Sequence, residues 1–126
     1  MMIRNACGGA LLAALVAASA LTPSRPAYAE GKFDGPWSVV VYTSTGPCDP
    51  SARFSGQIVN GQISYAYGSL EVTGRVESSG ATAVQVTYGS ARGEAHGRLT
   101  ETHGSGTWSG MGPEGHCTGT WAATRK

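Results

Sequence analysis

Apolar and polar residues alternate along almost the whole chain after Phe33. The clearest stretch runs from Leu70 to Glu77 (LEVTGRVE), where an apolar or small residue takes every second place. Because side chains two apart share one face of a β-strand, this period predicts strands with one buried and one solvent-facing side. No helical period follows residue 33, so the pattern predicts an all-β fold.

Turn residues divide this region into about eight strands. Asn60-Gly61 is the strongest hairpin signal, because both central positions of a type I′ turn need a positive φ. Ser44–Pro50, with two prolines and a cysteine, is a predicted loop. The sequence therefore predicts a small antiparallel meander that forms a closed or partly open β-barrel. The predicted strands cover residues 37–41, 52–59, 63–67, 70–77, 82–88, 94–101, 106–111 and 116–124.

A four-residue pattern, polar-Gly-polar-apolar, recurs in five of these strands. Each glycine would face inward beside its apolar partner, where it permits sharp bending or lets an aromatic ring from another strand lie on the bare backbone. With 17 glycines after residue 29, we expect tight curvature and an interior filled by side chains. Disorder is the alternative for so glycine-rich a chain, but the regular alternation and the aromatic residues favour a folded domain. The five copies are SGQI (55–58), TGRV (73–76), HGRL (96–99), SGTW (105–108) and TGTW (118–121).

Residues 1–29 have the three-part layout of a signal peptide. Arg4 precedes the apolar stretch Ala10–Leu21, and an A-x-A site at residues 27–29 predicts cleavage before Glu30. The alternative is a membrane anchor, but an apolar run of twelve is shorter than the roughly 20 residues a bilayer crossing needs. We therefore expect an exported protein, in the bacterial periplasm or outside the cell, with residues 30–126 as one domain.

Cleavage would remove Cys7 and leave Cys48 with Cys117, which are expected to form a disulfide in an oxidising compartment. A redox pair is the alternative, but the chain has no C-x-x-C. Seven basic and eight acidic residues would remain, a net charge of about −1 with no basic stripe. Nucleic acid is therefore not an expected partner, nor is an anionic membrane surface, and no anchoring follows signal cleavage.

No catalytic residue, metal site or cofactor is predicted. The spacings of His96, His103 and His116 match no zinc or copper signature, and we expect His96 on a polar strand face, His103 in a turn and all three in solvent. Ser109 has no G-x-S-x-G around it. A Ser–His–Asp site assembled in space stays open, because such triads have no fixed sequence order.

Aromatic residues are the better functional lead. The strand 62–67 (QISYAY) carries no charge on either face, and such a strand either completes the core or lines a pocket and meets a partner. The candidate binding residues are Trp37, Tyr65, Tyr67, Trp108 and Trp121.

Whole motifs resemble a group of short exported β proteins from alphaproteobacteria. The matching stretches are FDGPWSV (33–39), Cys48-Asp49, GSGTWSG (104–110) and CTGTW (117–121). No function is attached to that group, so the resemblance carries over no catalytic residue. The Gly-Thr-Trp stretches are also similar to avidin-type and lipocalin-like barrels, but Gly-x-Trp is common in β-barrels and no ligand residue is transferred.

Three functions compete. The first is a non-enzymatic binding or interaction protein, whose partner is a small molecule in a barrel mouth or another exported protein on an aromatic strand. The second is an inhibitor of an exported hydrolase that presents the loop 45–50, because a preorganised loop loses little entropy on binding. The third is a small hydrolase, which would need a histidine within hydrogen-bond reach of a serine or carboxylate.

Overall fold

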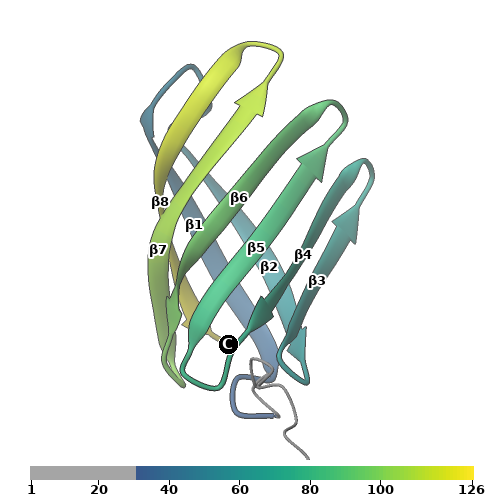
Figure 1. The fold of residues 1–126 in the computed structure, drawn as a ribbon, viewed down its shortest axis with the longest axis vertical. Helices are drawn as coiled ribbons and strands as arrows, with labels where there is room; N and C mark the ends of the chain where they lie inside the picture. Colours follow the sequence, from purple (N-terminus) through teal and green to yellow (C-terminus); the bar gives the residue numbers. More distant parts are fainter. Residues whose placement is uncertain (1–30) are drawn as a thin grey trace, which may run out of the picture.

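The computed structural model describes residues 31–126, so the predicted signal peptide, residues 1–29, lies outside the described part. Eight antiparallel strands each pair with the next, and β1 pairs with β8 to close a barrel (Figure 1). The predicted all-β meander is confirmed. The strands are β1 (Gly35–Thr45), β2 (Ser51–Val59), β3 (Gln62–Tyr67), β4 (Leu70–Val76), β5 (Ala81–Tyr88), β6 (Ala91–Leu99), β7 (His103–Gly112) and β8 (Gly115–Arg125).

Several predicted strand boundaries were wrong, and β6 begins at Ala91 where residue 94 was expected. The first strand continues to Thr45, because an irregularity between Thr43 and Thr45 lets β1 stay paired with β8. β6 ends at Leu99 and residues 100–102 form a turn, so Glu101 is not in a strand and His103 begins one. The Thr100 hydroxyl explains this turn, since it accepts the backbone N–H groups of residues 102 and 103, 3.4 and 3.0 Å away.

One end of the barrel is closed by a buried cluster. Phe33 and Trp37 belong to it, and the Trp37 indole donates to the Phe33 carbonyl at 2.8 Å. The Arg125 guanidinium lies 5.6 Å from the Trp37 ring and donates to the carbonyls of Lys32, Asp34 and Glu101. The last strand thereby fixes the N-terminal segment across this end. The cluster comprises Phe33, Trp37, Ile58, Val76, Leu99, Trp121 and Ala123.

The predicted hairpin turn between β2 and β3 lies at the same closed end. Asn60 and Gly61 have φ angles of 51° and 76°, as a type I′ turn requires. The Asp34 carboxylate accepts their two backbone N–H groups, at 2.9 and 3.4 Å. The N-terminal segment therefore holds this turn as well.

The opposite end, which we call the mouth, carries the predicted disulfide. Cys48 and Cys117 are bonded, with a Cα–Cα distance of 6.2 Å, and tie the loop after β1 to β8. The Thr43 hydroxyl donates to the Asp49 carbonyl at 2.6 Å and further fixes that loop. Covalent and hydrogen bonds therefore hold the mouth loop in place.

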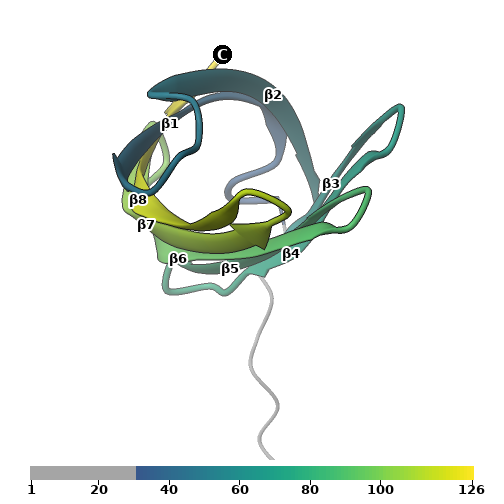
Figure 2. The ribbon, with the colours of Figure 1, turned by 90° about the horizontal axis from the view of Figure 1, so that it is seen from above.

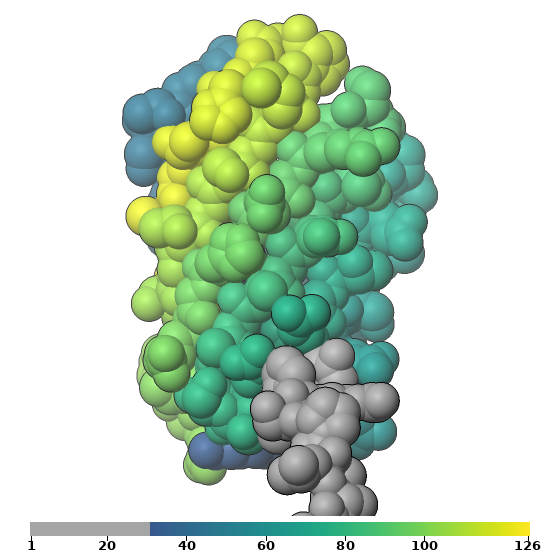
Figure 3. All heavy atoms as spheres, viewed as in Figure 1, coloured from purple at the N-terminus to yellow at the C-terminus, as the bar shows by residue number. Residues whose placement is uncertain are grey.

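The barrel wall is uneven. The space-filling view shows a continuous surface where β5, β6 and β7 lie (Figure 3). In contrast, β2 and β3 share only three residue pairs, which end at Gln57↔Ser64. Beyond that pair Ser51–Gly56 and Tyr65–Tyr67 have no partner across the gap, and from above the β3–β4 hairpin diverges from β2 (Figure 2). We call this unpaired stretch between β2 and β3 the slot. Within residues 31–126, no helix is long and apolar enough to cross a membrane.

Candidate ligand-binding cavity

Two tryptophans lie on inward-facing glycines, as the four-residue pattern predicted. A Cβ on Gly97 or Gly106 would come within 2.5 or 2.7 Å of the Trp121 ring, and one on Gly119 within 2.6 Å of the Trp108 ring. The indole N–H of Trp121 donates to the His96 carbonyl at 3.2 Å, and that of Trp108 donates to the Tyr42 carbonyl at 2.9 Å. Bare backbone therefore provides both the space and the acceptor for each ring.

The other two copies of the pattern behave differently. Nothing lies within 4 Å of a Cβ built on Gly56, and Gly74 faces the backbone and side chain of Val84. A tryptophan ring therefore lies on three of the five glycines in the pattern, Gly97, Gly106 and Gly119.

The interior is not filled by side chains, contrary to the expectation from glycine content. A cavity of about 420 Å³ lies above the buried cluster and opens at the mouth. Many inward positions in its wall hold residues too small to fill the space that the barrel's circumference encloses. These are Ala52, Gly56, Ala91, Gly93, Ala95, Gly110 and Gly112.

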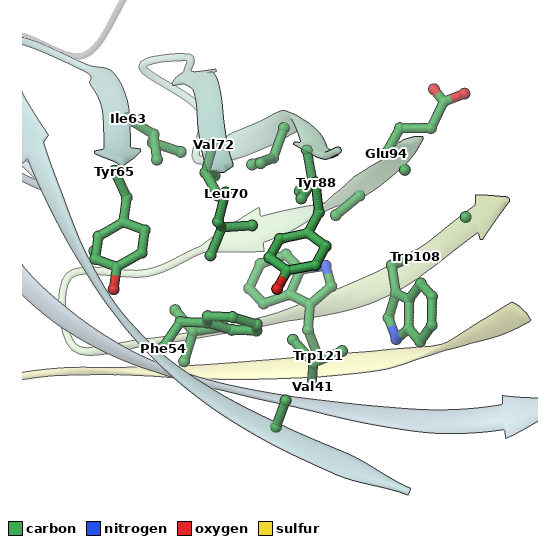
Figure 4. A pocket seen from close by; sticks show the side chains of 18 of the residues that line it. Val41, Phe54, Ile63, Tyr65, Leu70, Val72, Tyr88, Glu94, Trp108 and Trp121 are labelled. Carbon is green, nitrogen blue, oxygen red and sulfur yellow. The ribbon is translucent and has the colours of Figure 1, made fainter. Parts of the chain in front are cut away.

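The cavity wall is almost entirely aliphatic and aromatic. Phe54 lies opposite Tyr65, Leu70 and Tyr88, with Trp108 and Trp121 in the same space (Figure 4). The Glu94 carboxylate points away from the centre (Figure 4). A ligand inside would contact mainly apolar surface, with the charged residues Asp49, Arg92 and Glu94 at the border of the cavity.

The structure brings four of the five candidate aromatic residues to this cavity. Trp37 and Trp121, 2% and 7% exposed, form part of its floor, while Trp108 and Tyr65 are half-buried in its wall. Tyr67 is 76% exposed near the tip of the β3–β4 hairpin and does not line it.

Sequence reasoning did not single out Phe54, Leu70, Val86 or Tyr88, which line the cavity too. Their place on the inner face was available from strand alternation. Which inner positions border an unfilled space depends on the packing of all eight strands, and no single strand encodes it.

The hydroxyls of Tyr65 and Tyr88 are aimed into the cavity (Figure 4). Among residues 31–126, no hydrogen bond of either hydroxyl with another group is found. Each phenol therefore offers a donor and an acceptor to a molecule in the cavity.

The histidines lie outside this space, and none of them lines it. His96 Nε2 is 3.4 Å from Glu94 Oε2, with both side chains more than 60% exposed, and His103 Nδ1 is 2.9 Å from the Thr102 hydroxyl. Within the described residues no hydrogen bond joins a histidine to a serine, and no three His, Cys, Asp or Glu side chains are grouped to hold a metal. The His96–Glu94 pair meets the requirement for a histidine within reach of a carboxylate, but both side chains are exposed and no serine joins them in this part of the chain, so a histidine-based hydrolase stays a hypothesis.

Comparison with protein-family models, with curated proteins and with solved structures finds no match to this chain.

Proposed function

We propose that this protein is an exported, non-enzymatic binding protein that holds a small apolar molecule in its barrel. The observation that carries the proposal is the apolar cavity of about 420 Å³, open at the mouth. Ligand pockets in proteins span roughly 300–1,000 Å³ and combine apolar walls with a few polar groups. The Tyr65 and Tyr88 hydroxyls supply such groups here, which favours a ligand with one uncharged polar end.

Export is part of the proposal and rests on the leader-like residues 1–29 and the disulfide. Disulfides persist in oxidising compartments, so the bond between Cys48 and Cys117 is compatible with that location.

Titration with N-phenyl-1-naphthylamine, an uncharged fluorescent molecule, tests the binding function. Its fluorescence rises in apolar surroundings, and we expect saturable binding by the oxidised domain. Val86→Phe adds a ring to the cavity wall and should weaken binding at least about tenfold, since an occupied cavity leaves the ligand less space.

The matched control is Thr87→Phe, which puts the same ring on the outer face of the same strand. It should bind like the wild type. If Val86→Phe binds equally well, the dye is not in the barrel and the proposal is wrong.

The loop after β1 supports a second candidate, an inhibitor of an exported hydrolase. Residues 46–50 are all exposed, yet the disulfide and the Thr43–Asp49 hydrogen bond hold the loop. Preorganised exposed loops suit this task. Pull-down of purified exported hydrolases should then succeed with the wild type and fail with a loop deletion, with Asp49→Ala as the point variant; failure with the wild type would contradict it.

A further inference from the structure

The slot exposes backbone hydrogen-bonding groups of β2. Val59 and Gln62 flank the two-residue turn and form a hydrogen-bonded pair. Because such pairs occur at every second residue of an antiparallel ladder, the odd-numbered residues of β2 direct their N–H and C=O groups toward β3. The even-numbered ones face β1, as the bond from the Thr43 N–H to the Pro50 carbonyl illustrates. Beyond the last β2–β3 pair, the N–H and C=O groups that point into the slot belong to Ser51, Arg53 and Ser55.

β3 offers much less to the slot. The backbone N–H and C=O groups of its odd-numbered residues point toward β4. Beyond Ser64, Ala66 is therefore the residue of β3 whose backbone groups point toward β2. A chain placed in the slot would therefore bond chiefly to β2.

The slot also leads into the cavity. Ser55 and Gln57 are exposed residues on the outer face of β2, yet both border the cavity. On the inner face, Phe54 and Tyr65 project into the cavity from the two sides of the slot (Figure 4). A strand lying along β2 would place every second side chain between these two rings.

Charge and shape restrict what fits. β3 has no charged residue, and Arg53 is the one charged residue of β2. The Lys126 ammonium donates to the Ser55 hydroxyl at 2.8 Å on the outer face, while the inner face of the slot is apolar. The slot is open at the mouth and ends at the Gln57–Ser64 pair, so an occupant cannot run through it in register. These features favour an uncharged segment that ends inside the slot.

We propose that the slot binds the end of an extended, uncharged peptide as an added strand on β2, with its alternate apolar side chains in the cavity. This inference rests on the proposed function, because it uses the same cavity. A hydrocarbon chain would fill the cavity but leave the β2 edge unpaired, whereas an added strand satisfies both. In the antiparallel orientation, the peptide's N-terminal end lies at the closed end of the slot.

The test uses an N-acetylated peptide of about six residues in which threonine and valine alternate, a length that matches the free edge of β2. We expect it to displace N-phenyl-1-naphthylamine. In antiparallel pairs, directly opposed residues share a face, so the threonines lie outward opposite Ser51, Arg53 and Ser55 and donate to β2. N-methylation at the threonines removes these donors and should weaken binding at least about tenfold. N-methylation at the valines, the matched control, should change it only a few-fold.

A protein variant gives an independent arm. Arg53→Pro removes one N–H that faces the slot, and proline is tolerated at a strand edge. Arg53→Ala removes the same charge and keeps the N–H. We expect only the proline variant to bind the peptide more weakly, while both bind the dye like the wild type.

The outcomes separate the two proposals. If the dye binds but the peptide does not, or if both methylated peptides bind alike, the slot inference is overturned and the binding function stands. If the folded protein binds neither, both fall. Sedimentation equilibrium is the final check: a dimer to which the peptide does not bind would assign the slot to a second copy and overturn the inference.

Discussion

At the scale of single residues, the inward-facing glycines differ in what lies opposite them. A Cβ on Gly97 would meet the Trp121 ring and the backbone of Gly106, whereas a Cβ on Gly56 would meet nothing within 4 Å. Both glycines stand in the same sequence pattern and face inward on their strands. The atoms that lie over the glycine, which for Gly97 are the Trp121 ring and the backbone of β7, therefore decide whether glycine is required.

Gly97→Ala should destabilise the domain by about 1–3 kcal/mol, because the Trp121 ring or strand β7 has to move. Gly56→Ala should be neutral or stabilising by up to about 1 kcal/mol, since alanine restricts the unfolded chain. Urea denaturation followed by tryptophan fluorescence measures both. Equal effects of the two substitutions would contradict the role given to the ring.

The recurring pattern predicted rings on bare backbone, and this was confirmed where Trp108 and Trp121 supply them. It could not separate Gly56 and Gly74 from the rest. The spacing within a strand gives the direction of a side chain, but the ring that reaches a glycine comes from another strand, whose register is set by the whole sheet.

At the scale of elements, alternation gave the number, order and faces of the strands. It did not give the length of each ladder. Asn60-Gly61 is the strongest turn signal, yet it starts the shortest ladder, three pairs long. A turn sets where pairing begins. The length of the paired stretch depends on whether the two antiparallel strands stay side by side, and here the β3–β4 hairpin diverges from β2 (Figure 2).

Amide hydrogen exchange should show this slot directly. We expect the N–H groups of Arg53 and Ser55 to exchange at least about tenfold faster than those of Phe54 and Gly56, which face β1. Gln57 and Val59, which pair with β3, should be slow like the even-numbered residues. Two-dimensional NMR in deuterated water resolves each amide. Uniform protection along β2 would mean that the slot is closed.

The disulfide is the element-scale contact with the largest expected effect on stability. It closes a loop of 69 residues, and restricting the unfolded chain to that extent is worth about 4 kcal/mol. Reduction of the wild type should therefore lower the free energy of unfolding by roughly this amount. The double variant with alanine at positions 48 and 117 serves as the control, because its stability should not respond to the reductant. If reduction leaves the free energy of unfolding of the wild type unchanged, the estimate is contradicted.

At the scale of the whole molecule, the cavity shows where prediction from sequence stopped. High glycine content suggested a narrow, filled barrel, but eight strands set the circumference regardless of side-chain size. Small residues on the inner face, such as Gly93 and Ala95, then leave part of the barrel interior empty and do not narrow the barrel. Four of the five candidate aromatic residues nonetheless border that volume, because aromatic positions on inner faces follow from alternation.

Export and the disulfide-closed barrel are expected to depend on each other. With residues 1–29 present, the protein recovered from a bacterial periplasm should begin at Glu30 and contain the disulfide between Cys48 and Cys117. The same chain expressed in the cytoplasm without residues 1–29 should keep both thiols reduced and unfold at a lower urea concentration. Intact-mass measurement with thiol alkylation reports both the N-terminus and the oxidation state.

Because the disulfide fixes the loop at the mouth, the reduced protein should also bind N-phenyl-1-naphthylamine more weakly, and reoxidation should restore binding. A periplasmic product that retains residues 1–29 would contradict the cleavage site, and equal dye binding by both redox forms would show that the mouth loop does not shape the cavity.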